Sequence, residues 1–117
     1  MKAKLTILLA AVLAVTNVYA ANTYTVGNTI SEISAYSVEE SVFPEWKSYT
    51  QVAVNGALSW SAGGCNSNYV VIRKSDTHLL DLVNLAYINQ KTVVFGADTA
   101  VPKIGSSICL ARMVQVK

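Results

Sequence analysis

The hydrophobic and polar positions of this chain indicate several short strands and a single helix. From Ser48 to Trp60 apolar residues alternate with polar ones, and Val52, Val54 and Leu58 fall on one parity. This alternation is typical of a strand that buries one face. The Asn55-Gly56 dipeptide within it is a strong hairpin-turn signal, so the stretch is either two short strands or one long, bulged strand. We favour the long strand.

Four other stretches are predicted to be strands. They are Ile30–Val38, with either a bulge near its start or a start at Ile33, Cys65–Lys74, Lys91–Phe95, and Ile104–Val116, which forms one or two closing strands. The strand at 65–74 carries the run Tyr69-Val70-Val71-Ile72, which is apolar on both faces and predicts a central position. Residues 96–102 are expected to form a loop.

Apolar residues recur at spacings of three and four between the strands at 65–74 and 91–95, which predicts an amphipathic helix. The apolar stripe consists of Leu79, Leu82, Val83, Ala86 and Tyr87. Ser75 or Thr77 is expected to cap the helix, with Asp76 near its positive end. Asn89-Gln90 is expected to end it.

The order of these elements predicts an α+β domain that is mostly β. A five-stranded Greek-key barrel with a helix between the third and fourth strands is the OB-fold. We therefore expect an OB-like small barrel of about five strands.

The first twenty residues have the pattern of a secretory signal peptide. Lys2 and Lys4 precede an apolar run from Leu5 to Val15, and Val18 and Ala20 suit the −3 and −1 positions of a cleavage site. The run would span only about 16 Å as a helix, too short for a hydrocarbon core of about 30 Å. We expect cleavage after Ala20 and a single periplasmic or secreted domain at 21–117, with no membrane span.

The charge balance excludes two classes of partner. Lys2 and Lys4 are two of the nine basic residues and leave with the signal peptide, so the remaining basic residues equal the seven acidic ones in number. Arg73-Lys74 is the only adjacent basic pair. Nucleic-acid binders and polybasic membrane anchors need denser positive charge, so neither partner is expected.

The two cysteines, Cys65 and Cys109, predict a disulfide, because an even pair in a small exported domain is oxidised. Closing a loop of about 45 residues contributes roughly 3–4 kcal/mol in the chain-entropy model. A zinc site would need four ligands. The chain has one His and no Cys-x-x-Cys, so no metal or cofactor is expected.

No catalytic constellation is visible in the sequence. His78 is the only histidine and falls at the start of the predicted helix. Glu39 and Glu40 are adjacent and point apart, and Asp76 and Asp81 lie on different sides of a helix, so neither pair suits glycoside hydrolysis.

Exposed aromatic residues are the most credible binding feature. Sugar rings stack on aromatic faces, and Trp46 lies in a predicted loop beside Pro44, close to Tyr49. Trp46 and Tyr49 are the candidate ligand contacts. Trp60 is expected in the core, as large apolar side chains usually are.

Parts of residues 60–117 resemble known exported domains. The stretch from Leu79 to Val93, an aromatic-containing helix followed by Gln90-Lys91-Thr92-Val93, resembles the B subunits of AB5 toxins of the subtilase-cytotoxin and pertussis-like branch. Cys65 before Tyr69-Val70-Val71-Ile72 and the Pro102-Lys103-Ile104 motif resemble small secreted bacterial domains, although Cys109 here follows that motif. The toxin resemblance implies an OB-fold and homopentamers with the helix lining the centre.

Together these features predict an exported, non-enzymatic binding module that engages a glycan or a protein, with homo-oligomers as one form. The alternative is a periplasmic inhibitor or immunity-type protein that binds one protein partner. A small hydrolase ranks third, because the sequence offers no catalytic residues.

Overall fold

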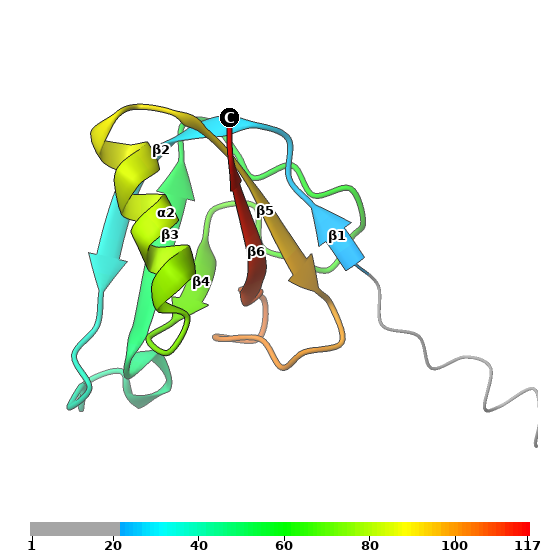
Figure 1. Cartoon of the computed structure of the whole chain (residues 1–117). Coiled ribbons are helices and arrows are strands. Elements are labelled where there is room, and N and C mark those ends of the chain that lie inside the picture. Colours follow the sequence, from blue (N-terminus) through cyan, green and yellow to red (C-terminus); the bar gives the residue numbers. More distant parts are fainter. Residues whose placement is uncertain (1–21) are drawn as a thin grey trace, which may run out of the picture.

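The computed structural model describes residues 22–117 (Figure 1). Its elements are β1 (Asn22–Tyr24), β2 (Asn28–Ala35), the 3₁₀-helix η1 (Pro44–Trp46), β3 (Tyr49–Val54), β4 (Val70–Arg73), α2 (Thr77–Ile88), β5 (Thr92–Asp98) and β6 (Ala111–Val116). The predicted signal peptide and its cleavage point lie outside the described residues. Within residues 22–117, no helix is long and apolar enough to cross a bilayer.

The six strands form one antiparallel sheet in the order β1-β5-β2-β3-β4, with β6 also paired to β5. β1 pairs with the end of β5, and β2 pairs with its beginning before continuing along β3. Gly27 lies in the break between β1 and β2, where a Cβ atom would come within 2.5 Å of Thr92 Cγ2. Glycine therefore allows the N-terminal strand to pass closely over the start of β5.

The prediction of a mostly-β α+β domain is confirmed, but the sheet is open and is not the closed barrel expected from the sequence. β4 is only four residues long and meets the segment before β6 at a single parallel bridge, between Val71 and Leu110. The Val71 amide donates to the Cys109 carbonyl there at 3.1 Å. A single bridge is not a continuous strand pairing, so it does not close the sheet into a barrel. The helix was expected between the third and fourth strands. It follows the fourth strand, β4, because the N-terminal strand is divided into β1 and β2.

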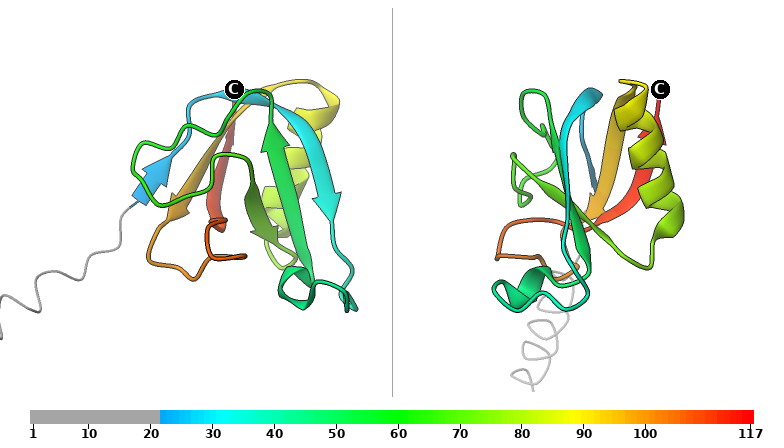
Figure 2. Two further views of the ribbon diagram at one scale, coloured as in Figure 1. Left: turned by 180° about the vertical axis from the view of Figure 1, so that it is seen from behind. Right: turned by 90° about the vertical axis from the view of Figure 1, so that its left-hand side faces the viewer.

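Two hydrophobic clusters lie on opposite faces of the sheet. α2 covers one face with Leu79, Val83 and Ala86, and the main core lies beneath it (Figure 2). Val71, Ile108 and Leu110 form the second cluster, on the side of the loop between β5 and β6. β4 is buried on both faces, as predicted. It stands at the end of the sheet order, however, because its outer edge meets the segment before β6 only at the Val71–Leu110 bridge.

The stretch at 48–60 follows neither of the predicted alternatives. β3 ends at Val54, and the chain turns at Asn55-Gly56 with a φ of 84° at Gly56. It does not fold back, because β2 and β4 already occupy the two edges of β3. Trp60 instead bridges to Thr25. The expected long strand is therefore wrong, and so is the hairpin.

Two predicted strands are much shorter than expected, since the stretch at 65–74 forms only β4 and the stretch at 104–116 forms only β6 and an isolated bridge between Ile104 and Ile108. The bulge in β2 falls between Ile30 and Glu32. The cap of α2 is Asp76 rather than Ser75 or Thr77, and its carbonyl accepts the amides of Leu79 and Leu80. α2 ends at Ile88, as predicted. β5 continues to Asp98 through part of the expected loop, because β1 pairs with these residues.

Thr25 provides a test of how β1 is joined to β5. Its buried hydroxyl oxygen accepts the Phe95 amide at 2.9 Å. Thr25→Val would leave that amide buried without a partner, so we expect a loss of about 1–3 kcal/mol in the free energy of unfolding, measured by urea denaturation. Thr29→Val removes an exposed hydrogen bond from Asn55 and is the matched control, with an expected loss below about 0.5 kcal/mol. Equal losses would contradict this interpretation.

Candidate functional site

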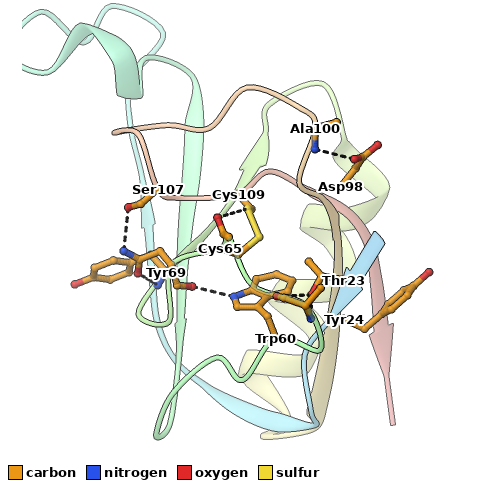
Figure 3. The surroundings of a disulfide bond; sticks show 12 residues. Thr23, Tyr24, Trp60, Cys65, Tyr69, Asp98, Ala100, Ser107 and Cys109 are labelled. Atoms are coloured by element: carbon orange, nitrogen blue, oxygen red, sulfur yellow. Dashed lines mark hydrogen bonds between the residues drawn. A yellow bond between two sulfur atoms is a disulfide. The ribbon is translucent and has the colours of Figure 1, made fainter. Parts of the chain in front are cut away.

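Cys65 and Cys109 form a disulfide, as predicted (Figure 3). Their Cα atoms are 5.4 Å apart, and the bond joins the loop after Trp60 to the segment before β6. Asn66 strengthens the same junction, because its amide donates to the Ser107 carbonyl at 2.9 Å. The loop at 61–69 is thereby fixed against the sheet.

Trp60 is a structural residue. It is partly buried against the main core, and its indole N–H donates to the Asn66 carbonyl at 2.9 Å (Figure 3). This agrees with its expected place in the core.

The structure separates the two candidate ligand contacts, Trp46 and Tyr49. Trp46 lies in η1, is half-buried, and packs against the second cluster and the Tyr36 ring, with ring centroids 5.3 Å apart. Tyr49 also touches the second cluster, but it lines a pocket as well. Trp46 does not line this pocket, so Tyr49 is the better-placed contact.

The pocket beside Tyr49, which we call the Tyr49 pocket, has a volume of about 440 Å³. It lies where β3 begins and β4 ends. The lining residues are Lys47, Ser48, Tyr49, Arg73, Lys74 and Ser75.

Strand register builds this pocket from two distant segments. Tyr49 and Arg73 are directly paired across the antiparallel strands β3 and β4. Ser48, in the left-handed region with a φ of 67°, accepts the Lys74 amide at 3.1 Å and donates its own amide to Ser37. These bonds hold the two cationic segments together at one end of the sheet.

The lining residues of the Tyr49 pocket are cationic or carry hydroxyl groups. Lys47, Arg73 and Lys74 bring positive charge, the two serines bring hydroxyls, and no carboxylate lines the pocket. Arg and Lys bind carboxylates, sulfates and phosphates through charge-assisted hydrogen bonds. The lining residues include no histidine, cysteine or acidic residue.

A second pocket, of about 270 Å³, shares Arg73 with the Tyr49 pocket. Its charged lining is balanced, with Arg73 and Arg112 opposed by Asp76 and Asp98. Arg112 also donates a hydrogen bond to the Tyr24 hydroxyl. The Asp98 carboxylate accepts the Ala100 amide (Figure 3). The mixed charge makes this pocket less suited to an anion than the Tyr49 pocket.

The residues considered for catalysis are dispersed. His78 is exposed near the start of α2, and Glu40 accepts the amides of Val42 and Phe43 in the loop after β2. Within the described residues 22–117, no group of three or more His, Cys, Asp or Glu side chains is placed to hold a metal ion.

The sequence patterns predicted Tyr49 as a ligand contact, but they did not predict that three cationic side chains line the same pocket. Arg73-Lys74 stood out as an adjacent basic pair, and Lys47 lies two residues before Tyr49. Their meeting depends on the register that pairs Tyr49 with Arg73. No local pattern encodes that register.

The chain matches no protein-family model, and no curated protein or solved structure is significantly similar to it.

Proposed function

We propose that this protein is an exported binding module that takes an acidic saccharide in the Tyr49 pocket. The single observation that carries the proposal is the pocket itself, where an aromatic ring and two hydroxyls lie among three cationic side chains with no acidic residue in the lining. A sugar ring suits the tyrosine face, and its carboxylate or sulfate suits the cations. The signal-like residues 1–20 support export.

The strand pairings support an OB-like arrangement. If β1 and β2 count as one interrupted strand, that strand lies between β3 and β5, β4 follows β3, and β6 follows β5. The sheet stays open between β4 and β6, where only the Val71–Leu110 bridge joins β4 to the segment before β6. The helix then lies between the third and fourth strands. OB-folds bind oligosaccharides on the face of strands 2 and 3 and on the loop between strands 1 and 2. The Tyr49 pocket lies at the corresponding place, on β3 and β4 beside the loop at 36–48.

Isothermal titration calorimetry with uronic-acid, sulfated and neutral oligosaccharides tests the proposal. We expect at least one of the two acidic classes to bind, and the neutral class to bind more weakly. Arg73→Ala should weaken that binding on the order of ten- to a hundredfold, because it removes a charge-assisted hydrogen bond.

Lys91→Ala is the matched control, because Lys91 is exposed and lies outside the pocket lining. We expect it to leave the affinity within about twofold, as a surface change away from a site does. Binding that is equal for acidic and neutral sugars, or that is indifferent to Arg73→Ala, would contradict the proposed function.

A further inference from the structure

The loop between β2 and β3 carries apolar side chains that the fold leaves exposed. We call this set the β2–β3 tip; it consists of Val38, Val42 and Phe43, whose exposed fractions are 47%, 75% and 57%. Three exposed apolar side chains in one short loop of a small domain are therefore candidates for an interaction surface.

The tip is held in a fixed shape. The Glu40 carboxylate accepts the amides of Val42 and Phe43 at 2.8 and 3.2 Å, and the Trp46 amide donates to the Phe43 carbonyl at 2.9 Å. Trp46 in turn packs against Tyr36. Because the loop is already ordered, little conformational entropy would be lost when the tip binds a partner.

Charge distinguishes the tip from the pocket beside it. Glu39, Glu40 and Glu45 surround the tip in the sequence, whereas Lys47, Arg73 and Lys74 line the Tyr49 pocket. Lys47 follows η1 directly, and the loop and the end of β4 lie at the same end of the sheet (Figures 1 and 2). An acidic, apolar projection therefore stands next to a cationic hollow.

We propose that the β2–β3 tip of one copy docks in the Tyr49 pocket of a second copy, forming a two-fold dimer. A surface that carries a projection next to a hollow of opposite charge is complementary to itself under a two-fold rotation. Each dimer would contain the contact twice, with carboxylates facing cations and the Phe43 ring removed from water. The dimer closes both pockets, so an acidic ligand competes with self-association.

Sedimentation velocity of the oxidised protein lacking residues 1–20 tests the dimer across a range of concentrations, without any saccharide. We expect a monomer–dimer equilibrium that weakens as salt is raised. Phe43→Ser should weaken it about tenfold or more. Ile88→Ser, which alters an apolar side chain on α2 that is even more exposed than Phe43, should leave it unchanged.

A charge exchange tests the pairing directly. Glu45→Lys alone and Arg73→Glu alone should each abolish the homodimer, because like charges then face each other in both contacts. Mixing the two variants should restore a dimer, since the lysine of one meets the glutamate of the other and the second contact is native. The proposal is overturned by a monomer at all concentrations, by a mixture that stays monomeric, or by an assembly that depends on Ile88 rather than Phe43. Because no ligand is used, its failure is distinct from failure of the saccharide proposal.

Discussion

Replacing both Cys65 and Cys109 by serine is expected to lower the free energy of unfolding by about 3–4 kcal/mol. The disulfide closes a loop across a sequence separation of 44, so its loss gives the unfolded chain much more conformational freedom. The bond also holds the loop at 61–69 beside Cys109, next to the single Val71–Leu110 bridge between β4 and the segment before β6. Small domains have net stabilities of about 5–15 kcal/mol, so this loss is a large share of the total.

Urea denaturation of the double variant measures this effect. Reduction of the unaltered protein is the matched control, because it breaks the bond without changing a side chain beyond the two sulfurs. The double variant and the reduced protein should both unfold at lower urea concentrations than the oxidised protein, by a similar amount. The oxidised protein should also run faster than the reduced form on a non-reducing gel. A double variant that unfolds at the same urea concentration as the oxidised protein would contradict the expected contribution.

Phe95→Ala is expected to cost about 3–5 kcal/mol, the other large effect. Phe95 is fully buried and, among residues 22–117, is the largest side chain buried to that extent. It lies in the main core on β5, the strand that pairs with β1, β2 and β6. Its removal would leave a cavity beneath the helix that the surrounding strands are too firmly paired to fill.

Phe43→Ala is the matched control, because the chain has only two phenylalanines and Phe43 lies on the exposed β2–β3 tip. At a protein concentration low enough for the monomer to predominate, we expect its effect on the unfolding free energy to stay within about 0.5 kcal/mol. Similar losses for the two variants would show that burial of Phe95 is not what stabilises the core.

Helical periodicity was sufficient to place α2 from the sequence. Leu79, Val83 and Ala86 recur at a spacing that only a helix brings onto one face, and these are its buried residues. The run at 69–72 likewise predicted a strand buried on both faces, because polar residues are absent from it. Such local patterns survive in the fold because burial of apolar surface enforces them.

Features that depend on distant partners could not be predicted in this way. Asn55-Gly56 has the composition of a hairpin turn, but the edges of β3 were already occupied by strands from elsewhere in the chain. β5 extends to Asp98 only because β1 pairs with it. The same reason explains the site, since Tyr49 was visible as an aromatic residue while its meeting with Arg73 follows from strand register.

A nuclear magnetic resonance titration of the ¹⁵N-labelled, oxidised protein with the acidic oligosaccharides shows where they bind. We expect chemical-shift changes to concentrate on the backbone amides of Lys47, Ser48, Arg73 and Lys74, and Arg73→Ala to reduce them greatly. Binding in the Tyr49 pocket would be contradicted if all the acidic sugars left the spectrum unchanged, or if the shifts gathered instead on the exposed face of α2 around Leu85 and Ile88.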